Sequence, residues 1–220
     1  DKKTINYEAV THALKTDKSI KVVFVQRSKG YLDRASLSAA EITRLYNEVK
    51  TVSDAFVVID NCYGEFCEKE EPKGDLLIGS LIKNPGGGIA ETGAYLVGTE
   101  KAVELAAARL TVPGIGLECG ASLGQTRPML KGLFFAPHTV SQALKTAAFA
   151  AALFEKLGYS VNPASQEERR DIIQTVSLGN AERLCAFCKG LQSGSPVDSF
   201  AAPEPWDMPG YSDPVIMAAG

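Results

Sequence analysis

The sequence is poor in the residues from which metal and redox sites are usually built. Its 220 residues include two histidines, one tryptophan and five cysteines. An odd number of cysteines, spread over a chain of this length, argues against the disulfide framework of a small secreted protein. Cys185 and Cys188 have the spacing of a metal or redox pair, but no second pair accompanies them. We therefore interpret them as ordinary thiols on a helix, with zinc or redox chemistry as the alternative, and predict no metal site.

Two further absences narrow the class of protein. Lys and Arg number 23 against 26 Asp and Glu, a net charge of -3, whereas proteins that bind nucleic acids or membrane surfaces usually carry a positive excess. No apolar run approaches the roughly 20 residues that cross a bilayer. The N-terminal DKKTINYEAV also lacks the apolar stretch of a signal peptide. We expect a cytoplasmic protein with no nucleic-acid or membrane partner.

The residues that are present suit a globular core. Hydrophobic residues make up 45% of the chain, which is enough to bury one. The chain begins with Asp1 and stops in the apolar PVIMAAG, without a cap, a turn or a charged tail. From these ends we expect an internal piece of a longer polypeptide.

Short apolar stretches alternate with amphipathic ones along most of the chain. We predict strands at 20–25, 55–59, 76–78 and 94–97, and helices at 6–16, 38–49, 100–110, 137–157 and 180–191. Continuous apolar strands between amphipathic helices are typical of a mostly parallel sheet sandwiched by helices. We therefore predict an α/β domain over residues 1–150. The alternating pattern after it indicates part of a smaller α+β domain at 151–220.

A lysine followed by a glycine-rich turn stands just after the third predicted strand. Lys83 precedes Asn84, Pro85 and three glycines. We expect burial at the strand end to lower the pKa of Lys83 and make its amine a nucleophile able to form a Schiff base. The alternative is a lysine that merely extends to solvent beside a turn. The pattern of a phosphate-binding P-loop is absent.

An acidic residue ends the preceding predicted strand. Asp60 lies 23 residues before Lys83 (83 − 60 = 23), which leaves room for one connection and one strand. In an α/β sheet, ligands bind at the carboxyl edge, so both side chains can reach one crevice. A lysine Schiff base with a carboxylate partner for a pyridinium nitrogen is characteristic of enzymes that use pyridoxal 5'-phosphate. Taken alone, Asp60 is equally well explained as the cap of a following helix.

Longer segments of the sequence point to one particular family of enzymes that use this cofactor. The chain closely resembles the pyridoxal-phosphate-dependent methionine γ-lyase-like or "aluminium resistance" family, relatives of the cystathionine lyases and synthases of fold type I. The resemblance runs through VVFVQRSKGYLDRASLS, FVVIDNCYGEF, GSLIKNPGGGIAETGAYLVG, RLTVPGIGLECGASLG and LKGLFFAPHTV. It implies that residues 1–150 form the cofactor-binding large domain.

The resemblance also implies roles for single residues. Lys83 is the expected internal-aldimine lysine, Asp60 the partner of the pyridine nitrogen, and Ser80 a contact of the cofactor phosphate. The sequence departs from the wider lyase group at Ile82, where a threonine is common, and the connection 72–74 is short. The phosphate loop and the ring-stacking aromatic that such proteins carry nearer the N-terminus have no counterpart in this chain.

Four further residues are candidates for the site. Arg27, after the first predicted strand, can contact the cofactor or bind a substrate carboxylate with two hydrogen bonds, or it is a surface arginine. Tyr63 can stack on the cofactor or donate a hydrogen bond to it, or it packs in the core. Asn84 can orient Lys83, or it starts the turn. Arg127 is a candidate substrate contact in a glycine-flanked loop that reaches a neighbouring subunit.

Together these residues predict a pyridoxal-phosphate-dependent carbon–sulfur lyase. The expected substrate is a sulfur-containing amino acid of the cystathionine or methionine type, which would lose its α-proton to the freed lysine. The resemblance implies a homodimer or homotetramer with its active site at the subunit interface. The alternatives are another pyridoxal phosphate reaction, such as aldol cleavage or transamination, and a catalytically silent relative that acts as a binding or structural subunit.

Overall fold

The computed structural model describes residues 4–32, 34–110, 112–118 and 122–218. The chain divides into two compact units. The first comprises Asp1–Leu153 and Asn162–Gln174, and the second Phe154–Val161 and Thr175–Gly220. Residues 162–174, which lie beyond the boundary predicted at 150, therefore pack with the first unit.

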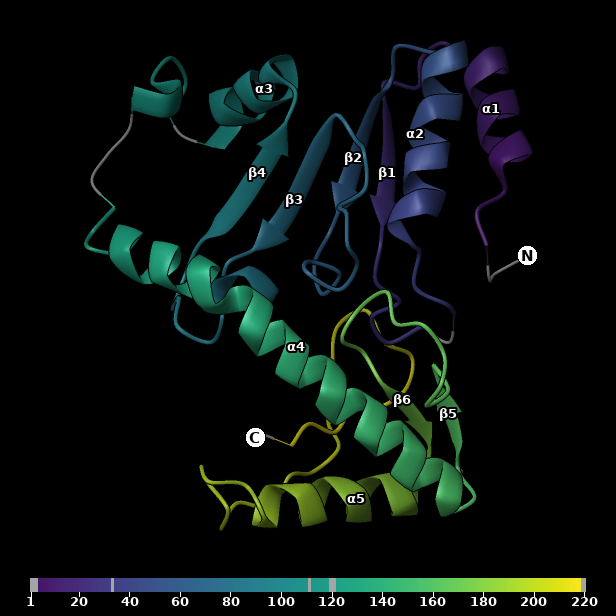
Figure 1. Cartoon of the computed structure of the whole chain (residues 1–220), viewed down its shortest axis with the longest axis vertical. Helices are drawn as coiled ribbons and strands as arrows, with labels where there is room; N and C mark the ends of the chain where they lie inside the picture. The colour runs from purple at the N-terminus through teal and green to yellow at the C-terminus, as the bar shows by residue number, and fades with distance from the viewer. Residues whose placement is uncertain (1–3, 33, 111, 119–121, 219–220) are drawn as a thin grey trace. The chain divides into compact units, whose positions relative to one another are not determined.

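A four-stranded sheet forms the centre of the first unit (Figure 1). Its order is β1 (Val22–Gln26), β2 (Phe56–Asp60), β3 (Leu76–Ser80) and β4 (Ala94–Gly98). The first three strands are parallel and β4 is antiparallel to β3. The predicted mostly parallel sheet is confirmed, and each strand lies within two residues of its predicted start.

The register of the strands brings three polar side chains to one end of one face. Gln26 pairs with Asp60, and Asp60 pairs with Ile78, two residues before Ser80. Paired residues share a face, and side chains alternate along a strand. Gln26, Asp60 and Ser80 therefore lie on the same face, at the carboxyl edge of the parallel strands.

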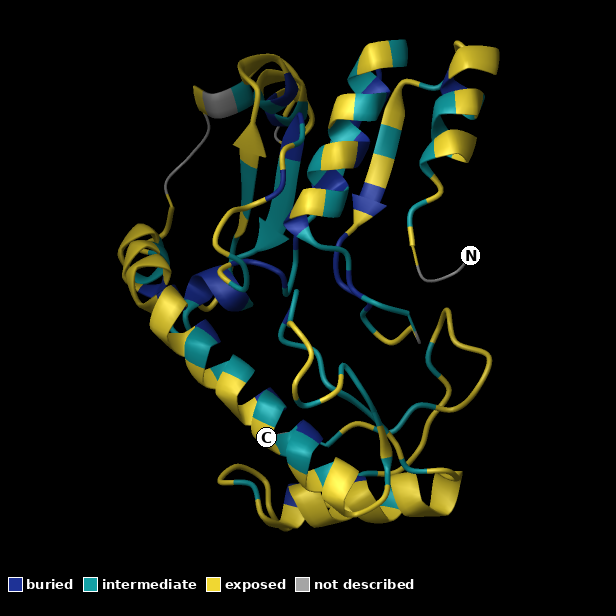
Figure 2. Ribbon diagram, turned by 45° about the vertical axis from the view of Figure 1, so that its right-hand side comes forward, coloured by how far each residue is buried: buried dark blue, intermediate teal, exposed yellow. Residues whose placement is uncertain are grey.

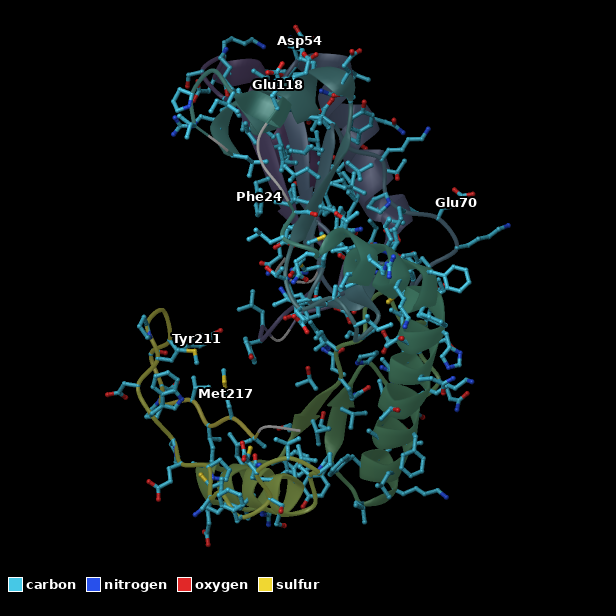
Figure 3. All side chains as sticks on the ribbon, turned by 90° about the vertical axis from the view of Figure 1, so that its left-hand side faces the viewer. Phe24, Asp54, Glu70, Glu118, Tyr211 and Met217 are labelled. Atoms are coloured by element: carbon cyan, nitrogen blue, oxygen red, sulfur yellow. The ribbon has the colours of Figure 1, made fainter. Side chains whose placement is uncertain are left out.

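The opposite face of the sheet holds the core. Helices α1 (Tyr7–Thr16) and α2 (Ala39–Val52) lie beside β1 and β2 (Figure 1), and Figure 2 shows α2 buried along one side and exposed along the other. Burying one such aliphatic side chain contributes roughly 1.5–3 kcal/mol. The core consists of Leu14, Val25, Ile42, Leu45, Val49, Ala55, Val57 and Ile59. On the other face Phe24 is 61% exposed and projects from the sheet (Figure 3).

The start of α2 follows directly from the sequence. Ser38 Oγ accepts a hydrogen bond from the Glu41 N–H at 3.1 Å, and the Glu41 carboxylate accepts one from the Ser38 N–H at 2.8 Å. This capping box satisfies two backbone donors that the helix itself leaves unpaired. The predicted helix start is confirmed.

Removing this cap should weaken the first unit measurably. We expect Ser38→Ala to lower the free energy of unfolding by about 1 kcal/mol, because the Glu41 N–H loses its acceptor. Urea unfolding followed by circular dichroism measures the change. Thr11→Ala, on the exposed side of α1, is the control and should not destabilise the protein. A cap variant as stable as this control would contradict the role of Ser38.

The longest helix begins earlier than the sequence predicts. We expected it to start at Pro137, but α4 spans Thr126–Lys156 with Pro137 inside it. Proline usually ends a helix because it has no N–H to donate. Here tertiary packing outweighs that preference: Ala136 is fully buried, and a Cβ on Gly132 would overlap the carbonyl oxygen of Gly86. The predicted end is confirmed, since Gly158 has the left-handed φ of 82° that follows a helix C-terminus.

The second unit contains β6 (Thr175–Ser177), most of β5 (Ser160–Asn162) and α5 (Ala181–Ser193). The helix predicted at 180–191 is present as α5, and the side-chain oxygen of Asn180 caps it. Phe154 makes edge-to-face contacts with Tyr159 and Phe187, each with ring centroids 5.8 Å apart.

The cysteines of the described residues form neither a disulfide nor a metal site. Cys185 and Cys188 both lie on α5 as free thiols, and Cys119 lies outside the described residues. Within the described ranges, no group of three or more His, Cys, Asp or Glu residues is arranged to hold a metal ion. The helices of those ranges also include none with the length and apolar character to cross a membrane.

The first unit also contains α3 (Glu100–Leu110) and two single turns, η1 (Asn84–Gly86) and η2 (Gly116–Glu118).

Candidate functional site

The candidate site lies where β2 and β3 end. Asp60 and Ser80 are the last residues of these neighbouring strands, on the face opposite α2. The Asp60 carbonyl accepts a hydrogen bond from the Arg27 N–H at 3.0 Å, which continues the β1–β2 ladder to the sheet edge. The turn that carries Lys83 follows Ser80 directly, so strand geometry places an acid, a hydroxyl and an amine in one region.

Lys83 sits at the N-terminus of η1 and is partly exposed. Its Nζ lies 4.6 Å from the centre of the Tyr63 ring. Burial alone would lower the pKa of Lys83, but the electrostatic interactions and hydrogen bonds of its side chain with Cys62 and Tyr63 outweigh burial and leave the pKa raised. The predicted lowering of the Lys83 pKa is therefore wrong. Lys83 rests as an ammonium ion at neutral pH.

Cys62 connects the two principal candidates. Its N–H donates to Asp60 Oδ1 at 3.1 Å. Burial raises the pKa of the Cys62 thiol, the hydrogen bond with Asp60 and the charge of Asp60 raise it further, and the charge of Lys83 opposes them. The thiol therefore lies within electrostatic reach of both Asp60 and Lys83. Cys62 is not among the residues predicted from the sequence, although its position two residues after Asp60 indicates that it lies near the site.

The backbone of Tyr63 has an unusual conformation. Its φ is 70°, in the left-handed region that a tyrosine rarely adopts. Its carbonyl oxygen accepts from Asn84 Nδ2 at 3.1 Å, from the Ile172 N–H at 3.2 Å and from Cys67 Sγ at 3.5 Å. Donors from three segments thus hold this residue in place.

Asn84 acts on the neighbouring loop. It is 6% exposed, and its amide nitrogen also donates to the Glu65 carbonyl at 3.1 Å. Asn84 therefore joins the turn that carries Lys83 to the loop that carries Tyr63. Asn84 is also the first residue of η1, which agrees with the alternative that it starts the turn. Its predicted role in orienting Lys83 stays a prediction.

Two of the glycines after Lys83, Gly86 and Gly88, have different surroundings. A Cβ on Gly86 would overlap the Leu81 carbonyl, so the tight turn requires glycine there. Gly88 has a φ of 74°, and nothing lies within 4 Å of where its Cβ would be. The turn therefore packs closely at its start and borders open solvent at Gly88.

Arg27 does not face this space. It is fully buried, and its guanidinium donates to Asn61 Oδ1 at 2.7 Å, Glu71 Oε2 at 2.8 Å and Glu68 Oε2 at 2.6 Å. A guanidinium held by two carboxylates and an amide is not available to a substrate carboxylate. The structure therefore contradicts the predicted cofactor and substrate contacts of Arg27 and gives it a structural role. Its partners lie 34 to 44 positions away in sequence.

A second buried acid lies beside the Arg27 network. Tyr95 donates to Glu65 Oε1 at 2.8 Å. Burial raises the pKa of Glu65 to about 7, although the hydrogen bond from Tyr95 opposes the change. A Cβ on Gly79 would overlap Tyr95 Cε1 and lie 2.6 Å from Glu65 Oε1, so a larger residue there would displace the Tyr95–Glu65 pair. This pair lies on the α2 side of the sheet, since Tyr95 pairs with Gly79 and side chains alternate.

The two remaining candidates differ in position. Ser80 is partly exposed on the Asp60 face, and its Oγ accepts from the Ile82 N–H at 3.4 Å. Arg127 is exposed in the first turn of α4, whereas we expected a loop. Its predicted contact with a neighbouring subunit stays a prediction.

Comparisons with known proteins show which family the chain is similar to. The methionine gamma-lyase family model matches residues 1–220. The uncharacterized protein YnbB of Bacillus subtilis is 49% identical over 98% of this chain and 52% of its own length. An uncharacterized 33.9 kDa protein of Lactobacillus delbrueckii subsp. bulgaricus is 50% identical over 98% of this chain and 72% of its own length.

Solved structures show the same relationship. The crystal structure of a carbon-sulfur lyase involved in aluminum resistance from Clostridium novyi NT shares 47% identity and a TM-score of 0.92 over 99% of this chain and 51% of that chain. This chain spans about half the length of that lyase and of YnbB. An aspartate aminotransferase from Thermus thermophilus, at 12% identity and a TM-score of 0.58, shares the fold alone.

Proposed function

The chain belongs to the methionine gamma-lyase family, and from this premise we propose that it contributes the lysine and the acid of a pyridoxal-phosphate-dependent carbon–sulfur lyase site. The observation that carries the proposal is the grouping of Asp60, Cys62 and Lys83 at one sheet edge. The proposed substrate is a sulfur-containing amino acid, and the proposed assembly is a homo-oligomer.

The chemical types of the side chains fit pyridoxal phosphate. Lys83 offers a primary amine for the aldehyde, Asp60 a carboxylate for the ring nitrogen, and Ser80 a hydroxyl for the phosphate. Asp60 and Ser80 end neighbouring strands at the same edge of the sheet, and the turn that carries Lys83 follows Ser80 directly. When bound, the cofactor supplies an electron-withdrawing ring that accepts the electron pair of the broken Cα–H bond of the substrate.

Each of the three residues then has a defined task. The Asp60 carboxylate stabilises positive charge on the ring nitrogen, and its hydrogen bond from the Cys62 N–H fixes its orientation. Ser80 donates to a phosphate oxygen. Lys83 would hold the cofactor by its nitrogen, and the same nitrogen would take the α-proton of the substrate. Loss of a thiol from the substrate side chain completes a lyase reaction.

The proposal is tested by trapping the cofactor on the full-length protein. Pyridoxal phosphate is added, the protein is reduced with borohydride, and peptides are mapped by mass spectrometry. We expect the label on Lys83 and a visible absorption band before reduction. Asp60→Asn should keep the label but lose turnover of cystathionine by about 10²-fold or more, because its amide does not balance a charged ring nitrogen.

The outcomes separate the alternatives. A label on another lysine, or none, would refute the cofactor assignment. A label on Lys83 without thiol release from any sulfur amino acid would favour a silent relative or another pyridoxal phosphate reaction. Unchanged turnover in Asp60→Asn would remove Asp60 from the site.

A further inference from the structure

We infer that Tyr63 holds the protonated amine of Lys83 against its ring, and that Asn84 is the positioning residue that keeps Tyr63 there. The inference deepens the proposed function and rests on it only for the catalytic meaning of the contact. The contact itself is a property of this chain and is testable without cofactor.

The first step is the position of the amine. Lys83 Nζ lies over the face of the Tyr63 ring, 4.6 Å from its centre. An ammonium ion at that distance is attracted by the negative face of an aromatic ring, whereas a neutral amine is attracted far less. Both side chains are partly buried, so water screens the attraction less than at an open surface. Tyr63 therefore favours the protonated form of Lys83.

The second step is the cost of placing the ring there. Tyr63 has a left-handed φ of 70°, a conformation unfavourable for a residue with a bulky side chain. Such a conformation persists only where surrounding contacts impose it. The three donors to the Tyr63 carbonyl, from Asn84, Ile172 and Cys67, are those contacts.

The third step identifies the donor that couples Tyr63 to Lys83. Asn84 follows Lys83 in the chain, and its buried amide donates to the carbonyls of both Tyr63 and Glu65. Asn84 thus fixes both the turn that carries Lys83 and the loop that carries Tyr63. Displacement of either segment would change the distance between Nζ and the ring.

The contact has a use in proton transfer. When Lys83 takes a proton, its nitrogen gains one N–H bond and a positive charge, and the electron pair of the broken C–H bond stays with the substrate. The Tyr63 ring is already in place to stabilise that charge. Cys62 is a further titratable side chain that acts on the amine, and Asp60 acts on Cys62.

The test is the titration of Lys83 in the cofactor-free full-length protein. Competitive acylation at a series of pH values, followed by peptide mapping, gives the pKa of this one amine. We expect Tyr63→Leu to lower that pKa by about half a unit to one unit, because the ring is lost. Tyr63→Phe should lower it less, since the ring stays and only the hydroxyl is removed.

Asn84→Ala tests the positioning role separately. We expect it to lower the pKa of Lys83 in the same direction as Tyr63→Leu. Adding Asn84→Ala to Tyr63→Leu should give no further change, because both act through one contact. Phe24→Leu, an exposed aromatic elsewhere on the sheet, is the control and should leave the pKa unchanged.

The results decide the inference in either direction. A wild-type pKa in both Tyr63→Leu and Tyr63→Phe, with an unchanged circular dichroism spectrum, overturns it. If Tyr63→Leu does not fold, Asn84→Ala carries the decision, because Tyr63→Phe keeps the ring that makes the contact. Additive effects of Asn84 and Tyr63 would refute the positioning role alone. Because no cofactor is present, failure here is distinct from failure of the proposed lyase activity.

Discussion

Lys83→Ala should lower lyase turnover by at least about 10²- to 10⁴-fold, the usual contribution of a positioned general base. The loss should exceed that of any other single change, because one nitrogen both holds the cofactor and takes the substrate proton. The measurement is thiol release by the full-length protein loaded with pyridoxal phosphate. Added methylamine should restore part of the activity to Lys83→Ala, since a small amine can enter the space left by the side chain.

Two controls separate chemistry from folding. Lys83→Arg keeps the positive charge and the contact with the Tyr63 ring, but an arginine does not lose its proton in proteins. It should therefore be as inactive as Lys83→Ala and should not respond to methylamine. Lys131→Ala, an exposed lysine on α4, should turn over normally. Turnover of Lys83→Ala within tenfold of the wild type would refute the assignment of Lys83 as the lysine that takes the substrate proton.

The strands and caps were predictable because their signals are local. Apolar runs such as 55–59 and the Ser38/Glu41 pair contain their own structural cause within a few residues. The grouping of Asp60 with Ser80 was also predictable in outline, since strands that follow each other in a parallel sheet end at the same edge. The start of α4 was not, because the packing of Gly132 against Gly86 joins segments far apart in sequence.

The electrostatics of the site could not be predicted from local sequence. The pKa of Lys83 depends on Cys62 and Tyr63, which reach it from the loop after β2. Burial at the end of a strand, which lowers this pKa, could be predicted from the sequence. The neighbouring side chains that raise it could not. The position of Tyr63 depends in turn on a donor from Ile172, more than a hundred residues further along the chain.

Arg27 shows the same limitation most clearly, and it carries the largest expected effect on stability. Arg27→Met should lower the free energy of unfolding of the first unit by about 3 kcal/mol, because Glu68 and Glu71 lose their shared cation and Asn61 loses a donor. Glu68 also accepts from the Ala39 N–H at the start of α2, so the loss should spread to that helix. Urea unfolding followed by circular dichroism measures it.

Two further arginine variants serve as controls for Arg27→Met. Arg44→Met removes an exposed ion pair with Glu48 and should cost less than about 1 kcal/mol. Arg27→Lys should fall between the two, since one ammonium cannot reproduce three directed contacts. Equal stabilities of Arg27→Met and Arg44→Met would contradict the buried network.

Gly64 provides an independent test of the same packing, without any change of charge. A Cβ on this residue would lie 2.5 Å from Arg27 Cδ and 2.8 Å from its guanidinium carbon. Elsewhere a flexible arginine could move away from a methyl group, but here two carboxylates hold its far end. Gly64→Ala should therefore destabilise the protein in the wild type and much less in Arg27→Met, whose unbranched side chain is free to move. An identical loss in both backgrounds would mean that Gly64 is required for its own backbone and not for Arg27.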